Sequence, residues 1–468
     1  MLDCASQACA VQMMNSRDAS FGRLLLGRGC AMMPVKAAVA DEVRAGEGGV
    51  RGFYTLEVTQ IAHGGEGIGR VQGKVVFVPY CIPGETVLVE VVEERKKWAR
   101  ARLVEVQRPS EDRISPPCPY YGHCGGCHFQ HVRYERQLAF KEEVVRGQMA
   151  RLGGMVDAPV GPTLSVGDPW RYRNHVQLAV DREGRLGFRE ARGRGVVPIE
   201  ACLLMHPLLA ETFDALELEG GEAGEGHEEP TLIRRISLRA GVGTGERMVI
   251  FETYGDAPLE LAVDIPLSCV LLRSDGVPVV LAGSDYFYEV VGGRRYRISA
   301  SSFFQVNTAG AEVLTGLVRE MLAPAPSHRL LDLYCGVGLF GLALAGDVAQ
   351  VVGVEENPMA VRDARLNAAE LPHVQILEGA AEEVVLTLSE PFDLAVVDPP
   401  RDGLAPEAIS LLARQPVSRL AYVSCDPATL ARDARKLRRA GYRLVQVQPV
   451  DLFPQTYHVE TVALWEGR

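Results

Sequence analysis

One cysteine stands where an apolar, strand-like run gives way to a helix-like one. The stretch AYVSCDPATL, residues 421–430, continues after Cys425 with Asp426 and Pro427, which can begin a helix. A free cysteine is usually a small, buried, apolar residue. At a helix N-terminus, however, the pKa of a thiol falls, and the thiolate is a nucleophile. Taken alone, Cys425 is either a packed thiol, which is the commoner case, or the nucleophile of a covalent mechanism.

A second group of cysteines has the spacing of metal ligands. Cys118, Cys124 and Cys127 lie in CPYYGHCGGC, where Gly-Gly lets the last two thiolates converge on one centre. Sets of four thiolates hold either zinc or an iron–sulfur cluster. The fourth ligand must come from elsewhere, and Cys202, after a strand-like run, is the best candidate. The spacing predicts a metal site and leaves zinc and iron–sulfur open.

A glycine-rich turn suits a nucleotide-like cofactor. GVGLFG, residues 336–341, matches the dinucleotide fingerprint, and Glu355 follows at the distance of a ribose-binding acid. The motif alone does not separate NAD from S-adenosylmethionine. Asp332, at the end of the preceding strand-like run, would repel a pyrophosphate but can accept hydrogen bonds from a methionine ammonium. Asp398, in an Asp-Pro-Pro run at the tip of a later strand, also favours S-adenosylmethionine.

These positions belong to one region with a regular alternation of strand and helix patterns. Residues 296–468 therefore predict an α/β domain with a doubly wound, Rossmann-like sheet. In such a sheet the carboxyl ends of the strands share one crevice. Cys425, Glu355 and Asp398 would meet there.

The residues before this domain are rich in strand patterns. Residues 51–110 predict a small OB-like β-barrel, and 111–295 a central, mostly β domain that carries the cysteines. The run RKKWARAR, residues 95–102, is either a solvated hairpin or an oligonucleotide-binding surface. Residues 1–50 lack periodicity and predict a flexible extension in which the cysteines are incidental. The acidic, glycine-rich run 220–229 predicts a loop insertion.

Composition limits the kind of protein. The chain has 468 residues and a net charge of −11, so any nucleic-acid contact must be local. No apolar run is long enough to span a membrane. The odd total of 11 cysteines argues against a secreted disulfide framework and for a reducing compartment. We expect a cytoplasmic monomer.

Five segments, taken in order, resemble the uracil-C5 RNA methyltransferases: SASSFFQVN, LDLYCGVGLFGL, VVDPPRDGL, YVSCDPATLARD and DLFPQTYHVETVALW. GGEGIGR followed by GKVVFVPYCIPGE resembles the TRAM domain, an RNA-binding barrel. The resemblance covers residues 52–468. Together with the four cysteines, the barrel makes the chain similar to the branch of this family that acts on 23S ribosomal RNA and carries a [4Fe-4S] cluster. The resemblance thus implies that Cys118, Cys124, Cys127 and Cys202 hold this cluster, and that residues around 130–160 pack on the methyltransferase domain.

The resemblance also implies roles at the strand ends. Four residues would hold S-adenosylmethionine: Gln305, Tyr334, Glu355 and Asp398. Phe303 would stack near the target base, Cys425 would be the nucleophile and Glu460 the general base, with His458 as its rival. Asp398 and Arg401 could orient the uracil.

The implied chemistry is covalent catalysis. A thiolate that adds to uracil C6 makes C5 nucleophilic, and a base then removes the C5 proton so that the thiolate can leave. The base must be unstacked, so we expect a single-stranded or loop uridine of 23S rRNA as the substrate, and not DNA. The alternatives are a tRNA uracil-C5 methyltransferase, a non-catalytic RNA-binding or ribosome-assembly factor and, more distantly, an NAD-dependent redox enzyme.

Overall fold

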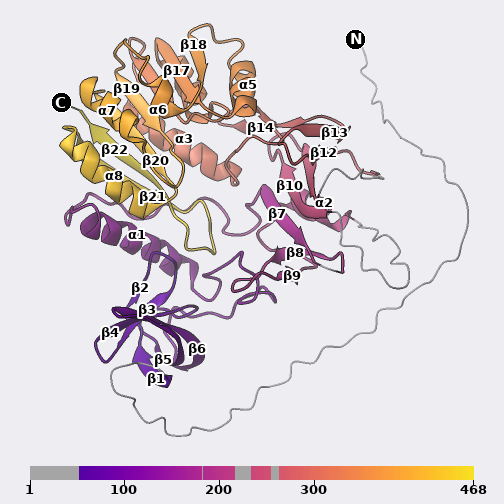
Figure 1. The fold of residues 1–468 in the computed structure, drawn as a ribbon, viewed down its shortest axis with the longest axis vertical. Coiled ribbons are helices and arrows are strands. Elements are labelled where there is room, and N and C mark those ends of the chain that lie inside the picture. The colour runs from indigo at the N-terminus through magenta and orange to yellow at the C-terminus, as the bar shows by residue number, and fades with distance from the viewer. Residues whose placement is uncertain (1–51, 182, 217–232, 255–262, 468) are drawn as a thin grey trace, which may run out of the picture. The chain divides into compact units, whose positions relative to one another are not determined.

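The computed structural model describes residues 52–181, 183–216, 233–254 and 263–467. The predictions for residues 1–50 and 220–229 lie outside these ranges. Within them, no helix is long and apolar enough to cross a membrane. Three β-rich or α/β regions follow one another along the chain (Figure 1).

The first region is a six-stranded sheet in the order β1-β5-β6-β4-β3-β2. β4 and β6 pair in parallel, and the other neighbours are antiparallel. Alternate side chains turn inward to one core that includes Val76, Val78, Val87 and Val89. The strands are β1 (Gly52–Glu57), β2 (Gln60–Ile61), β3 (Gly67–Val71), β4 (Lys74–Val78), β5 (Thr86–Glu94) and β6 (Trp98–Arg108).

The central region is a seven-stranded sheet in the order β13-β12-β11-β10-β7-β8-β9, with one helix packed on it. Leu209 of the helix lies in the same core as Ile236 and Leu238. A two-stranded hairpin follows and leads to the last region. The elements are β7 (His175–Val180), β8 (Leu186–Arg189), β9 (Val196–Pro198), α2 (Pro207–Asp214), β10 (Ile233–Ala240), β11 (Arg247–Thr253), β12 (Ser268–Leu272), β13 (Pro278–Ala282), β14 (Tyr286–Val291) and β15 (Arg294–Ser299).

The C-terminal region is a seven-stranded sheet in the order β18-β17-β16-β19-β20-β22-β21. Its first five strands are parallel, and β22 runs antiparallel to both of its neighbours. The strands are β16 (Arg329–Leu333), β17 (Gln350–Glu355), β18 (Val374–Glu378), β19 (Leu394–Val397), β20 (Arg419–Ser424), β21 (Arg443–Val450) and β22 (Glu460–Glu466).

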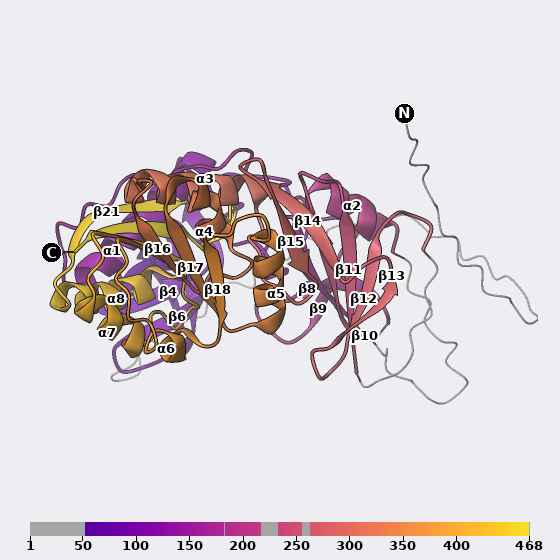
Figure 2. The ribbon, with the colours of Figure 1, turned by 90° about the horizontal axis from the view of Figure 1, so that it is seen from above.

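Helices cover both faces of this sheet (Figure 2), so its parallel strands are almost continuously apolar. One face packs on α3 and α4, and the other on α7 and α8. The helices are α3 (Thr308–Leu322), α4 (Leu339–Leu344), the short 3-10 turn η1 (Ala345–Asp347), α5 (Pro358–Asn367), α6 (Ala381–Val384), α7 (Pro406–Arg414) and α8 (Pro427–Arg439).

One helix that precedes the central sheet in the chain belongs in space to the last region. α1 (Tyr134–Arg151) lies beside α8 and β21 (Figure 1). Its Val145 and Met149 are fully buried in the same core as Ala431 and Leu437 of α8. The segment thus extends the helical cover of the C-terminal sheet.

Candidate active site

The site gathers at the carboxyl ends of the parallel strands, where the antiparallel β22 begins. Ser424, the last residue of β20, pairs with Thr461 in β22. Because the two strands are antiparallel, Cys425 and Glu460 are the next residues beyond that pair and face each other across the ladder. Asp398 directly follows β19, the other neighbour of β20. Register alone brings a thiol and two carboxyls together.

The charges of this group act on one another. Burial, then Glu460 and Asp398, raise the pKa of Cys425 to about 11, with Arg401 opposing them. Burial and then Asp398 raise the pKa of Glu460 well above its usual value. Burial likewise raises the pKa of Asp398. The expectation that the following helix lowers the thiol pKa is therefore wrong for this structure, because burial and the neighbouring carboxylates outweigh the helix N-terminus.

A tight turn holds Cys425. Asp426 caps α8, since its Oδ1 accepts hydrogen bonds from Ala428 N and Thr429 N, both 2.8 Å long. On the other side, Ser424 Oγ accepts from Asp426 N at 3.2 Å and donates to Asp426 O at 3.0 Å. Cys425 is thus flanked by two residues, Ser424 and Asp426, that are hydrogen-bonded to each other.

The glycine loop after β16 adopts left-handed backbone conformations at Tyr334 (φ 62°), Gly336 (φ 56°) and Gly338 (φ 91°). Glu355, the last residue of β17, holds the loop because its Oε2 accepts from Gly336 N at 2.9 Å. Its Oε1 accepts from Asn357 N at 2.8 Å, and Asn357 itself caps α5. Glu355 is therefore a loop-positioning carboxylate and not a helix cap.

Asp332 is the buried carboxyl below this loop. Its Oδ2 accepts from Gly341 N at 2.7 Å, and a Cβ at Gly341 would lie 2.8 Å from that oxygen. Its Oδ1 is buried without a partner among the described residues. Burial raises its pKa to about 7, with Asp398 and Glu355 adding to the rise. A cationic amine would satisfy such an oxygen, so this cradle fits the methionine end of S-adenosylmethionine.

The segment 299–307 carries two further predicted site residues. Gln305 is buried, whereas the Phe303 side chain is 69% exposed and free to meet a base. Asp363 of α5 anchors the segment because it accepts from Ser299 N at 2.7 Å and from Ser302 Oγ at 2.7 Å. The loop is therefore fixed at its base, with one aromatic ring left in solvent.

The loop between β21 and β22, which ends at Glu460, is clamped from α1. Gln455 N donates to Gln137 Oε1 at 3.1 Å, and Gln137 Nε2 donates to Gln455 Oε1 at 3.0 Å. Lys141 forms a buried ion pair with Asp451, and its Nζ donates to Phe453 O at 3.1 Å. These contacts fix the backbone that delivers Glu460 to Cys425.

His458, the rival base, packs among rings in this loop. Its ring centroid lies 4.2 Å from that of Tyr457 and 5.9 Å from that of Phe453. Burial, then His128, and then the cationic side chains nearby lower its pKa to about 4. The histidine thus packs among rings in a buried position that favours its neutral form.

The four cysteines of the second group are free thiols and electrostatic neighbours. Burial, with Cys202, Cys124 and Cys118 adding to it, raises the pKa of Cys127 to about 12. Gly126 N donates to Cys124 Sγ at 3.4 Å. The donor set suits a Cys4 cluster, yet among the described residues no three side chains of ligand type converge closely enough to hold a metal ion.

Backbone hydrogen bonds connect this cysteine segment to both neighbouring regions. Gly125 N donates to Arg189 O of β8 at 2.9 Å. His128 N and Phe129 N donate to Gln455 O at 2.8 and 3.0 Å. The segment after Cys127 therefore supports the loop that leads to Glu460.

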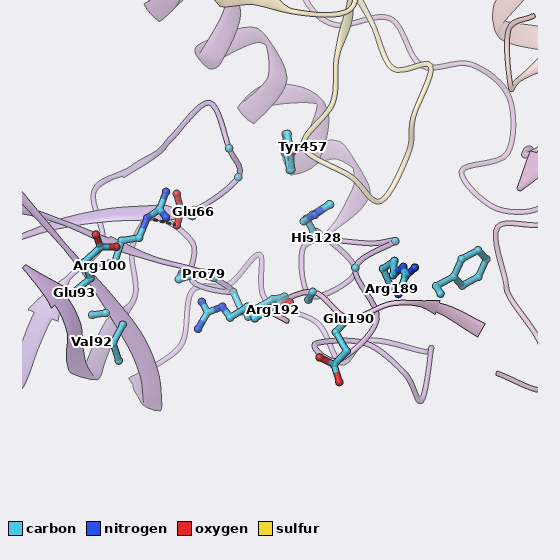
Figure 3. A pocket seen from close by; sticks show the side chains of 18 of the residues that line it. Glu66, Pro79, Val92, Glu93, Arg100, His128, Arg189, Glu190, Arg192 and Tyr457 are labelled. Carbon is cyan, nitrogen blue, oxygen red and sulfur yellow. Dashed lines mark ion pairs between the residues drawn. The ribbon is translucent and has the colours of Figure 1, made fainter. Parts of the chain in front are cut away.

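A groove of about 800 Å³ opens between the first β region, the cysteine segment and the β8–β9 connection (Figure 3). Its cationic side chains are Arg100, Arg189 and Arg192, and its rings include Tyr80, His128 and Tyr457. Arg100 also lies 5.6 Å from the Trp98 ring centroid and 3.7 Å from Glu66. The run 95–102 thus forms the end of the β5–β6 hairpin and contributes one arginine to the groove.

Two family matches cover most of the described chain. Residues 50–104 match the TRAM domain, and residues 268–468 match the tRNA (Uracil-5-)-methyltransferase family. An RNA methyltransferase of Thermosynechococcus vestitus is 36% identical over 87% of this chain and 97% of its own length. One of Halalkalibacterium halodurans is 34% identical over 88% of this chain and 96% of its own.

The chain belongs to the TRAM-containing RNA uracil-5-methyltransferase family. A solved structure agrees: the tRNA (uracil-54, C5)-methyltransferase of Pyrococcus abyssi in complex with S-adenosyl-L-homocysteine has a TM-score of 0.70 and 28% identity. The match covers 88% of this chain and 100% of that one. The predicted enzyme class, an S-adenosylmethionine-dependent RNA uracil-C5 methyltransferase, is confirmed, as are the TRAM and methyltransferase domains.

Several residues that shape this methyltransferase site were not predicted. Asp363 and Asp433 sit in VRDARLN and ARDARKL, and each is a buried carboxylate on the inward face of a helix. Asp433 Oδ2 accepts from Leu404 N at 2.8 Å and would meet a Cβ at Gly403 (φ 87°) at 2.3 Å, so it fixes the loop after Asp398. An aspartate among apolar positions of a helix was the available signal.

Proposed function

We propose that this enzyme methylates C5 of a single-stranded or loop uridine in 23S rRNA, with Cys425 as nucleophile and Glu460 as general base. The observation that carries the proposal is the placement of these two residues on adjacent ends of β20 and β22, beside Asp398. A thiol and a carboxyl at adjacent strand ends of one crevice can supply the nucleophile of an addition and the base of the elimination that later reverses it.

The proposed reaction begins at the Cys425 thiol. Cys425 must lose its proton, and a neighbouring carboxylate, Glu460 or Asp398, can take it and release it to water, so that Glu460 is again a carboxylate for the later step. Sγ then bonds to uracil C6, the electron pair moves to C5, and C5 takes the methyl group that the bound donor supplies. Glu460 removes the C5 proton, the C5–C6 double bond re-forms, and Sγ leaves as thiolate. Arg401 faces this group and opposes the rise of the thiol pKa.

We assign S-adenosylmethionine binding to four residues around the glycine loop: Gln305, Tyr334, Glu355 and Asp398. Glu355 and the left-handed loop present backbone and carboxylate groups at the strand ends. The unpartnered Asp332 Oδ1 supplies an acceptor for an amine. A solved relative named for its complex with S-adenosyl-L-homocysteine supports the choice of donor.

We further propose that Cys118, Cys124, Cys127 and Cys202 hold a [4Fe-4S] cluster that supports the fold and the RNA-binding surface. The cluster would supply four bonds that draw the thiols to one centre. Methyl transfer needs no electron, so no step of the reaction passes through it. The groove lined by Arg100, Arg189 and Arg192 would hold the RNA backbone, with nearby rings available for stacking.

The two candidate substrates are 23S rRNA and tRNA. We favour 23S rRNA because of the cysteine set, whereas the match to tRNA-named enzymes favours tRNA. Mapping 5-methyluridine in both RNAs from a deletion strain tests this: loss confined to 23S rRNA supports the proposal, and loss confined to tRNA replaces it. If Cys425→Ala and Glu460→Gln variants restore all 5-methyluridine, the chain acts as a non-catalytic factor. We expect the enzyme to be a cytoplasmic monomer.

A further inference from the structure

A turn of the TRAM domain reaches the residue that follows Cys425. His63 Nε2, in the β2–β3 turn, lies 3.3 Å from Asp426 Oδ2. The turn is closed by hydrogen bonds from Ala62 N to Glu66 O (2.8 Å) and from Gly65 N to Ala62 O (2.9 Å). His63 therefore contacts Asp426 from a well-defined backbone rather than from a loose loop.

The same turn packs against the loop that carries the general base. Gly65 has a left-handed conformation (φ 81°), and a Cβ there would lie 2.8 Å from Tyr457 Cβ. Only glycine allows this approach without displacing Tyr457. The turn thus touches both Asp426, next to Cys425, and the segment three residues before Glu460.

Asp426 links His63 to the nucleophile. One carboxylate oxygen caps α8 and the other faces His63, while the backbone of Asp426 is bonded to Ser424 on the far side of Cys425. Burial opposes the ionisation of Asp426, but the bonds from His63, Thr429 N and Ala428 N outweigh it and lower its pKa to about 2. A charged Asp426 accepts strongly from an N–H donor.

The ring of His63 has one suitable donor. Its Nδ1 is buried without a partner among the described residues, so a proton there would lack an acceptor. The proton therefore belongs on Nε2, which faces Asp426. Glutamine places a side-chain N–H donor in nearly the same position, whereas alanine removes it.

We propose that His63 is a positioning residue that fixes the Cys425 turn through Asp426, so that the TRAM domain completes the active site of the methyltransferase domain. This inference rests on the proposed role of Cys425. Gly64, Gly65 and Glu66 of the same turn line the groove that also contains Arg100, Arg189 and Arg192, and Figure 3 labels Glu66 there. RNA held in that groove therefore contacts the turn that positions the nucleophile.

The test compares His63→Ala with His63→Gln in the full-length protein, with Gln60→Ala, an exposed side chain of β2, as control. Three quantities are measured: the single-turnover methylation rate at saturating RNA and donor, RNA affinity, and the pH profile of Cys425 alkylation by iodoacetamide. The alkylation is followed on the Cys425 peptide. The charged groups that face Cys425 are Asp398, Arg401, Asp426 and Glu460, and none is altered.

We expect His63→Ala to slow single turnover about five- to tenfold, as for a lost hydrogen bond to a partly exposed charged acceptor, and to shift the alkylation profile. His63→Gln should restore both, and Gln60→Ala should leave them unchanged. Unaltered turnover and alkylation in His63→Ala would overturn the proposal, as would an equal loss of RNA affinity alone in both His63 variants. If no wild-type RNA methylation occurs but the alkylation shift remains, the proposed function fails while the positioning role stands.

Discussion

Cys425 and the four-cysteine set both consist of partly buried thiols, but different kinds of backbone position them. Cys425 continues a strand whose neighbours are paired on both sides, and ladder register places it opposite Glu460. The four cysteines lie outside named helices and strands. Their thiols are close enough to raise one another's pKa, but they are not gathered as ligands in the described residues.

This difference between strand and loop shows which side chains the backbone hydrogen bonds alone can bring together. Paired strands fix the backbone of the residues that we propose for the active site. The cysteine segment is held by backbone hydrogen bonds to Arg189 O and Gln455 O, and the cluster that we propose would draw its thiols to one centre. Hydrogen-bonded strands therefore position the residues that we propose for catalysis, whereas loops carry the four cysteines that we propose as ligands.

The largest expected contrast comes from making the same substitution in both regions. Cys425→Ser should lower the methylation rate by at least about 10⁴-fold, because the hydroxyl is a poor nucleophile at C6. Cys202→Ser should instead remove iron and acid-labile sulfide from anaerobically reconstituted protein and lower the rate less than about tenfold. Radiolabel transfer and metal analysis measure the two effects. Equal rate losses would contradict the separation of roles.

The pH dependence of the methylation rate should show whether Asp398 acts on Cys425 and Glu460. Raised pKa values favour the protonated forms of Glu460 and Cys425, so the single-turnover rate should rise with pH as the carboxylate and thiolate forms increase. Asp398→Asn removes a negative charge that raises both pKa values. At saturating donor, its rate profile should therefore shift to lower pH. An unchanged profile, or a shift to higher pH, would show that Asp398 does not act on the pair.

The clamp behind Glu460 should dominate stability in this part of the molecule. Lys141→Met leaves the buried carboxylate of Asp451 unpaired and should lower the free energy of unfolding by about 3–5 kcal/mol. Arg443→Ala breaks an exposed ion pair with Glu466 at the other end of β21 and β22, and should cost less than about 1 kcal/mol. Urea unfolding measures both. Similar losses would mean that the buried pair does not hold the loop.

The smallest effect concerns the groove beside the cysteine segment. Arg192→Ala removes one cationic side chain and should reduce the slope of log affinity against log salt by about 0.7–1 for single-stranded RNA. Arg443→Ala, which lies away from the groove lining, should keep the wild-type slope. Filter binding over a salt series measures the slope. If Arg192→Ala also keeps it, the RNA backbone does not pass this side chain.

The sequence allowed the strand ends to be predicted because apolar strands, glycine turns and capping residues are local signals. Residues that act across the fold were missed: Gln137 and Lys141 lie more than 300 positions from the loop that they clamp. The thiol pKa was predicted in the wrong direction, since the helix N-terminus is visible in the sequence but the burial beside Glu460 and Asp398 is not. The spacing of the cysteines indicated a metal site. The arrangement of their thiols could not be predicted, because the cysteines lie in loops, where no strand pairing fixes the backbone. The roles of the individual site residues stay predictions.

Covalent adduct formation tests the central claim most directly. The enzyme is incubated with methyl-labelled S-adenosylmethionine and RNA containing 5-fluorouridine, which has no C5 proton for Glu460 to remove. We predict a labelled protein–RNA band that survives denaturation, maps to the Cys425 peptide and is absent for Cys425→Ala. A labelled adduct that still forms with Cys425→Ala would contradict the assignment of the nucleophile.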